Sequence, residues 1–333
     1  MSSGLQKAER GARPDHPVTV RLLALCLAGL VALFAFTVPE RSANAEQSAT
    51  LTLQDHPLVG KIYDTAAQSF VSADQMTRVL ASSTHLLLGE IHDNPEHHRL
   101  QAEIIRRLVA DDVRPTIVME MFGGMPTKAL EALEAERRKA QKVSAADYAR
   151  RLGWAKSGWP PFEIYAPIFD TAITHSLPLA SARPAVDSGG KVQAVLDAAA
   201  LPAAENDELL DELKSSHCGL ITGEKAKTIL PRMVRAQRKL DAALAMTMRQ
   251  AEGPSVLISG SGHARMDRGV PHYLRHFERK SITVNFREVV DGKSDPAALI
   301  ADGEADYIWF TPRVARGDVC AQMREMFAKR KKP

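Results

Sequence analysis

The sequence predicts an α/β fold in three layers: a mostly parallel β-sheet with helices on both faces, together with a helical cap. Two observations predict it. Between residues 84 and 310, short apolar runs alternate with longer segments of helical periodicity, which is the pattern of βαβ units. Three of the short runs are followed directly by Glu, by Glu and His, or by Gly-Ser-Gly-His. Such residues are expected where a strand ends in a ligand-binding strand–helix turn.

The strands are predicted by uninterrupted apolar runs. The runs at 86–88 and 117–119 contain no polar residue, which is typical of strands buried on both faces of a parallel sheet. In chain order, strands are expected at 60–64 (a short edge strand), 84–89, 115–119, 177–182, 254–259, 282–286 and 305–310.

The helices are predicted by capping residues and by apolar spacing. Asn94 is a good N-cap and Pro95 a good first helical residue, so a helix should begin there. Helices are expected at 73–81, 95–109, 126–152, 161–175, 194–213 with a joint at Pro202, 223–248 (long and amphipathic) and 270–277. The helical segments on either side of the third main strand are expected to form the cap. We expect one domain over 46–333, with its core at about 60–316.

Composition excludes some classes of partner. The hydrophobic and charged fractions, 45% and 25%, are ordinary for a globular protein, and a net charge of +3 indicates no nucleic-acid partner. The basic run from Lys329 to Lys332 is interpreted as a solvated tail.

The first 45 residues have the order of a secretory signal peptide: basic residues, an apolar run at 22–38, and a small-residue cleavage site ending at Ala45. We therefore expect an exported, periplasmic protein, with a net charge of about +1 after cleavage. Two alternatives are less favoured. One is an uncleaved membrane anchor at 22–38, and the other is lipidation at Cys26, which lies too close to the start of the apolar run.

Cleavage would leave two cysteines, Cys218 and Cys320. In an oxidising compartment an even pair favours a disulfide. The alternative is two buried thiols that pack as small hydrophobic groups.

Ionisable residues follow three of the predicted strands. Glu90 and His92 follow the first main strand, Glu120 the second, and His263 the fourth. The carboxyl ends of parallel strands share one edge of a sheet, so these four side chains are expected to converge. His98 lies on an otherwise apolar line of its helix and should point inward toward them. His97, its neighbour, is interpreted as a solvated residue of the first turn.

Two kinds of chemistry suit this Glu/His set. Glu90, His92, Glu120 and His263 are suitable ligands for a divalent metal such as Zn, Mn, Co or Fe. Without a metal, two buried glutamates would raise the pKa of one of them and form a general acid/base couple.

Six segments resemble the ChaN family of haem-binding uptake proteins, which shares a superfamily with the Tiki proteases, the TraB proteins and the erythromycin esterases. They are Leu-Gly-Glu-Ile-His-Asp-Asn-Pro-Glu-His-His-Arg-Leu-Gln at 88–101, Val-Met-Glu-Met-Phe at 118–122, Gly-Trp-Pro at 158–160, His-Cys-Gly at 217–219, Arg-Ala-Gln at 235–237 and Gly-Ser-Gly-His-Ala-Arg at 260–265. The resemblance runs from about Gly60 to Arg316. It implies an α/β fold, an envelope location, and haem or iron as ligand.

The resemblance also implies haem at a dimer interface, hence a homodimer, and envelope transport partners. The site residues that the resemblance implies are Glu90, His92, His98, Glu120, His263 and Arg265. Members are often lipoproteins, and the ordinary cleaved signal of this chain departs from that pattern.

Two main functions follow. The first is haem binding in iron or haem uptake, which needs an apolar face, an axial ligand and a cation for the propionates. Tyr165 and His217 are the axial candidates. The second is a metal-dependent hydrolase, a peptidase or esterase, that uses the Glu/His set to activate water. A purely structural envelope protein is a third class.

Overall fold

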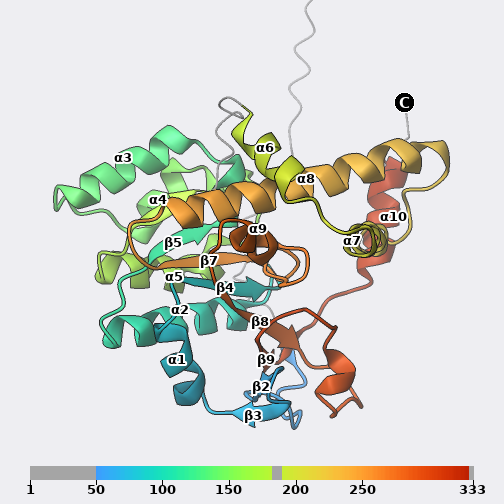
Figure 1. Ribbon diagram of the computed structural model, residues 1–333, viewed down its shortest axis with the longest axis horizontal. Helices are drawn as coiled ribbons and strands as arrows, with labels where there is room; N and C mark the ends of the chain where they lie inside the picture. The colour runs from blue at the N-terminus through green and yellow to red at the C-terminus, as the bar shows by residue number, and fades with distance from the viewer. Residues whose placement is uncertain (1–49, 182–189, 330–333) are drawn as a thin grey trace, which may run out of the picture. The chain divides into compact units, whose positions relative to one another are not determined.

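The computed structural model describes residues 50–181 and 190–329 (Figure 1), which belong to one compact unit. The predicted signal peptide at 1–45, the apolar run at 22–38 and Cys26 lie outside the described residues, as do the last four residues of the chain. None of the described helices combines the length and apolar character that crossing a bilayer requires.

The central sheet has eight strands in the order β3-β2-β9-β8-β4-β7-β5-β6. The strands are β2 (Ile62–Asp64), β3 (Ser69–Val71), β4 (His85–Glu90), β5 (Thr116–Met119), β6 (Leu179–Ser181), β7 (Ser255–Gly260), β8 (Ile282–Glu288) and β9 (Tyr307–Thr311). The six strands from β9 to β6 are mutually parallel, while β2 and β3 are antiparallel additions at one end. A separate ribbon pairs β1 (Leu51–Thr52) with β10 (Arg313–Val314).

The helices alternate with the strands as predicted. They are α1 (Ala73–Ala81), α2 (Pro95–Ala110), α3 (Thr127–Arg138), α4 (Ala145–Arg151), α5 (Phe162–Thr174), α6 (Lys191–Ala198), α7 (Ala203–Ser216), α8 (Gly223–Gln250), α9 (Val270–His276) and α10 (Val319–Lys329). Short 3₁₀ turns occur at Glu120–Gly124 (η1), Trp154–Lys156 (η2) and Ala297–Leu299 (η3). Asn94 caps α2 as expected: its side chain accepts a hydrogen bond from the backbone N–H of Glu96.

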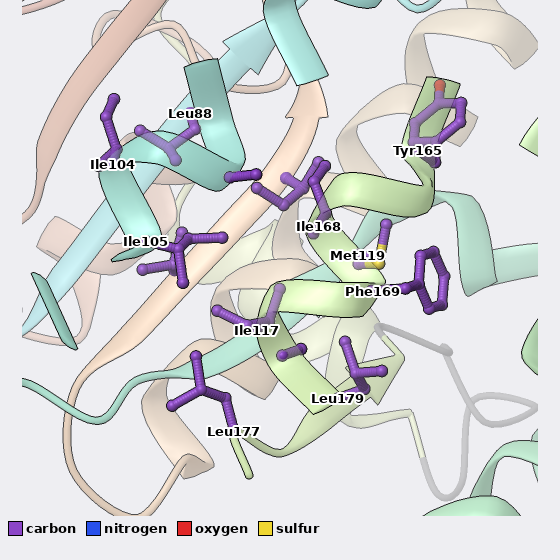
Figure 2. Close-up of a cluster of buried hydrophobic side chains, with 14 of the residues drawn as sticks. Leu88, Ile104, Ile105, Ile117, Met119, Tyr165, Ile168, Phe169, Leu177 and Leu179 are labelled. Atoms are coloured by element: carbon purple, nitrogen blue, oxygen red, sulfur yellow. The ribbon is translucent and has the colours of Figure 1, made fainter. Parts of the chain in front are cut away.

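Two apolar layers fix the sheet between the helices, which confirms the three-layer prediction. On one face, Leu88, Ile117 and Met119 of the sheet pack with side chains of α2 and α5 (Figure 2). On the other face, Leu87, Val118 and Leu257 pack against α6, α8 and α9. Because residues i and i+1 of a strand face opposite sides, the apolar runs supply both layers.

Three expectations are corrected. The strand at 62–64 is not the edge of the sheet, because the unpredicted β3 pairs outside it. The expected helix at 126–152 is two helices, α3 and α4, and the capping box of Ser144 begins the second. The helix α10 at Val319–Lys329 is not among the predicted helices, and the basic run that begins at its last residue lies mostly outside the described residues.

The disulfide prediction is confirmed. Cys218, after α7, is bonded to Cys320 of α10, and their Cα atoms are 5.5 Å apart. The bond joins positions 102 residues apart.

Candidate functional site at the strand ends

The predicted Glu/His residues meet at the carboxyl ends of the three central strands. Glu90 ends β4 and pairs in register with Gly260, which ends β7. Glu120 follows β5 directly and opens η1. His263 lies in the turn between β7 and α9. Sequence-distant residues converge here because their strands are neighbours in a parallel arrangement.

Glu90 is the centre of one half of the site. It is 2% exposed, and its Oε1 accepts hydrogen bonds from His92 Nδ1 at 2.9 Å and from the Tyr165 hydroxyl at 3.1 Å. Its Oε2 lies 2.9 Å from His98 Nδ1, an ion-pair contact without the angle of a good hydrogen bond.

His98 is a buried cation. Its Nε2 lies 3.0 Å from the carbonyl of His92, and its Nδ1 faces Glu90 and the Gln101 carbonyl oxygen. The Gln101 amide nitrogen donates to Leu88, which orients that oxygen toward His98. Because every partner is an acceptor, both ring nitrogens carry protons. Burial opposes this charge, but Glu90 raises the pKa of His98.

His263 is the centre of the other half. Its Nδ1 donates to Asp241 of α8 at 2.5 Å, and its Nε2 lies 3.2 Å from Glu120 Oε1. Oε2 of Glu120 accepts the backbone N–H of Gly260 at 2.8 Å. The amide of Gln237, one helical turn before Asp241, lies 3.0 Å from His263 Nδ1. His263 is thus held between two buried carboxylates.

The halves meet at Gly260. A Cβ there would lie 3.0 Å from His92 Nε2 and 3.7 Å from Glu120 Oε2. Only a residue without a side chain lets the ring of His92 approach the strand end so closely.

The pairing sets the protonation states. Burial would raise the pKa of Glu90, yet the charges and hydrogen bonds of His98 and His92 hold it well below its usual range. Burial would likewise raise the pKa of Glu120, but His263 lowers it. Against the effect of burial, Glu120 and Asp241 raise the pKa of His263 well above its usual value. Burial raises the pKa of Asp241 to about 6, against the opposing charge of His263.

The expectation that one glutamate has a raised pKa is therefore wrong, because each glutamate has its own histidine partner. The carboxyl with the raised pKa is Asp241, which no sequence motif indicates. It lies on an amphipathic helix far along the chain, where an isolated Asp gives no signal of its own.

His92 is the exposed member of the site. Its side chain is 36% exposed, whereas that of His98 is 0% and that of His263 is 9%. Its ring packs edge-on against Trp159, with centroids 4.8 Å apart. Since Nδ1 donates to Glu90, Nε2 is the atom left for a ligand or a proton.

A clamp around Arg316 holds the turn that carries His92. The Arg316 guanidinium contacts both oxygens of Asp93 at 2.5–2.7 Å and both oxygens of Glu288 at 2.7–2.8 Å. Glu288 also accepts a hydrogen bond from the side chain of Asn94 at 2.8 Å. The residues that follow His92 are thus fixed from β8 and from the C-terminal segment.

Four residues singled out from the sequence have positions or surroundings other than those expected. Tyr165 is fully buried and its hydroxyl donates to Glu90, so it orients that carboxylate and offers no open face to haem. His217 ends α7, and its Nδ1 contacts the Leu213 carbonyl; no hydrogen bond joins it to the Glu/His set within the described chain. Arg265 is turned away, onto Asp267. His97 is not solvated but fully buried.

The structure does not support a divalent-metal centre. Among residues 50–181 and 190–329, no three His, Cys, Asp or Glu side chains are grouped to hold an ion. The four predicted ligands instead satisfy one another as carboxylate–imidazole pairs.

The fold of this chain resembles that of a solved ChaN protein. ChaN of Campylobacter jejuni, whose structure shows cofacial haem binding, is 20% identical over 74% of this chain and 95% of its own, with a TM-score of 0.59. Weaker matches are the type III effector HopBA1 (12% identity, 72% of this chain, 92% of the other, TM-score 0.42) and a mutant of the erythromycin esterase EreC (13% identity, 75% of this chain, 81% of the other, TM-score 0.38). No curated protein matches it.

The family model for haem-binding uptake proteins of ChaN type, in the Tiki superfamily, matches residues 76–274, which is more than half of the sequence and includes the whole Glu/His set. This chain therefore belongs to the ChaN family of haem-binding uptake proteins.

Proposed function

We propose that the protein is an exported haem-binding protein of iron or haem uptake, and that His92 is the residue that ligates haem iron. One observation carries the choice of residue: His92 is the only histidine of the described Glu/His set whose side chain is substantially exposed. Its Nδ1–H donates to Glu90, which is how metal-ligating histidines are usually oriented. The donor set therefore fits haem iron, which an axial imidazole would hold and tune.

Export is supported by two features of the chain. The order of residues in 1–45 is that of a secretory signal, and the Cys218–Cys320 bond suits an oxidising compartment. We place the mature protein in the periplasm, where envelope transport partners would deliver or collect its ligand.

A homodimer is part of the proposal. The solved ChaN from Campylobacter jejuni binds haem cofacially, and two stacked haems fit a site shared by two copies of a chain. Trp159, beside His92, would then pack against the porphyrin of its own copy.

The test is a haem titration of residues 46–333, followed by absorption spectroscopy of His92→Ala, Tyr165→Phe and His217→Ala. We expect a saturable Soret band at about one haem per chain or fewer. His92→Ala should lose or shift that band, because the exposed imidazole is gone, while the other two variants keep it. His175→Ala, on a half-buried histidine at the end of α5, is the matched control.

Loss of the band in His217→Ala with an unchanged band in His92→Ala would show that His217, at the end of α7, is the axial ligand. Absence of any specific band in the unmodified protein would overturn the haem proposal itself.

A second candidate function is hydrolysis of a peptide or ester bond by the same Glu/His set. The observation that favours it is the series Asp241–His263–Glu120, in which His263 lies between two carboxylates beside the exposed His92. His92, oriented by Glu90, would take the proton of water, and the protonated His263 would supply positive charge. Glu120→Gln should abolish such an activity and leave haem affinity largely intact. Loss of haem binding in that variant would argue against separate roles.

A further inference from the structure

A cavity lies beside the Glu/His set, on the side of β8. It has a volume of about 320 Å³. Ile91, between Glu90 and His92 in the sequence, and Ser261, which follows Gly260, form the wall nearest the site. The rest is built by the end of β8, by η3 and by Arg313 of β10.

The wall of this cavity is largely apolar. Ile91, Phe286, Val289, Val290 and Leu299 contribute to it. Phe286 and Val289 are almost completely buried, while Leu299 packs at the edge of a small cluster with Val289. An apolar wall of this kind takes a hydrocarbon body.

The charges around the cavity are not balanced. The lining carboxylate, Glu288, is already bound through both oxygens by Arg316. The lining guanidinium of Arg287 is paired with Glu304. Arg313 is exposed, and no Asp or Glu of the described ranges lies within ion-pair distance of its side chain. The cavity therefore has one cation free to pair with a ligand.

We propose that this cavity binds a medium-chain fatty carboxylate, with the hydrocarbon chain against the apolar wall and the carboxylate on Arg313. A volume of about 320 Å³ is at the lower end of the range of small-molecule pockets, which suits a chain of medium length. A guanidinium is the side chain best matched to a carboxylate. The inference does not depend on the proposed function, because it uses neither His92 nor haem.

The test is a calorimetric titration of residues 46–333 with decanoate. We expect one saturable site for decanoate and no binding of acetate, which lacks the chain. Decan-1-ol, with the chain but no charge, should bind at least tenfold more weakly than decanoate, the factor that corresponds to one charge-assisted hydrogen bond. Arg313→Gln should lower the affinity for decanoate by about tenfold and leave the affinity for decan-1-ol unchanged.

Arg279→Gln is the matched control. It removes the same charge from an exposed residue that lines a different cavity, with His85 and Ile282 at the start of their strands. A second variant, Leu299→Phe, enlarges a side chain of the wall and should reduce decanoate affinity while hexanoate still binds. Equal binding of decanoate in Arg313→Gln and unmodified protein would overturn the proposal, as would equal loss in Arg279→Gln.

Haem provides the last discriminating measurement, because its propionates are also carboxylates on an apolar body. We expect decanoate to bind a haem-loaded sample, and Arg313→Gln to leave the haem titration unchanged. If haem displaces decanoate and Arg313→Gln weakens both ligands, the cavity is part of the haem site and the fatty-carboxylate assignment fails. Failure of haem binding with intact decanoate binding would instead count against the proposed function alone.

Discussion

His97 and His98 are neighbours on α2, both are buried, and their pKa values move in opposite directions. His98 faces Glu90, which raises its pKa. His97 Nδ1 accepts the backbone N–H of Ile91 at 2.9 Å, and its Nε2 lies 2.8 Å from the Thr311 hydroxyl. Burial, with the nearby charge of His98, lowers the pKa of His97 to about 3. A carboxylate partner, and not burial, decides which buried histidine is charged.

We expect His97 to make the protein sensitive to mild acid. Above pH 6.5 the residue is neutral in both the folded and unfolded states. Between pH 6.5 and about 3, the unfolded chain binds a proton there that the folded chain does not. Stability should therefore fall as the pH falls through this window, with up to about one extra proton taken up on unfolding. Urea unfolding at a series of pH values measures the slope.

His97→Gln is the comparison, since its amide can still accept from Ile91 and donate to Thr311. In this variant the acid slope should be smaller by up to one proton. An identical slope in both proteins would show that His97 is already protonated in the fold.

For single residues, their positions after the predicted strands were enough to predict that Glu90, His92, Glu120 and His263 form one cluster. They were not enough to predict how the members pair. His97 looked like a solvated first-turn residue because its partner, Thr311, lies on a strand more than 200 positions away. Tyr165 is an axial candidate by sequence because nothing local reveals that its hydroxyl donates a hydrogen bond to Glu90.

The element that positions the site is β4, at the centre of the sheet. Its residue Gly89 lies between Ser259 of β7 and Asn285 of β8. A Cβ on Gly89 would stand 1.9 Å from the Asn285 side-chain oxygen and 2.9 Å from the Cβ of Ala264. Glycine is therefore required by close approach in the middle of a strand, where it would otherwise weaken the sheet.

Gly89→Ala should destabilise the fold by about 2 kcal/mol, because the added methyl forces Asn285 and Ala264 apart and this outweighs the gain in strand propensity. Urea unfolding measures the loss. In an Asn285→Ser background the loss should shrink, since the obstructing oxygen is gone. Gly124→Ala, which meets nothing within 4 Å, should change stability by less than about 0.5 kcal/mol. Equal effects of the two substitutions would contradict the packing argument.

Most elements could be predicted from periodicity and caps, and the exceptions have physical reasons. Helix α1 has the bounds expected from the sequence because Ser72 and Gln75 form a capping box around its start. The break between α3 and α4 was missed because residues 139–144 are mostly as helix-compatible as their neighbours. The strand β3 has only three residues and two of them are exposed, so it forms no apolar run, and its pairing with β2 is what makes it a strand.

For the whole molecule, the Cys218–Cys320 bond is the main covalent constraint among the described residues. It ties α10 to the turn between α7 and α8 and closes a loop of about 100 residues. By chain entropy, such a loop can contribute about 5 kcal/mol through the unfolded state.

We expect Cys218→Ser with Cys320→Ser to lower the Tm by roughly 10 °C. Calorimetry with and without a reductant is the measurement. Reductant should lower the Tm of the unmodified protein to that of the double variant and leave the variant unchanged. A Tm insensitive to reductant in both proteins would show that the bond does not limit stability.

The Arg316 clamp has a practical consequence for anyone shortening this protein. The segment matched by the family model ends at residue 274, yet Glu288 and Arg316 lie beyond that limit and hold Asp93 and Asn94 beside His92. A fragment cut at the matched boundary would also lack β8 and β9, and β4 would lose one of its two neighbours. The boundary of detectable similarity is thus not a boundary of folding, and an expression fragment that retains the His92 turn must extend past Arg316.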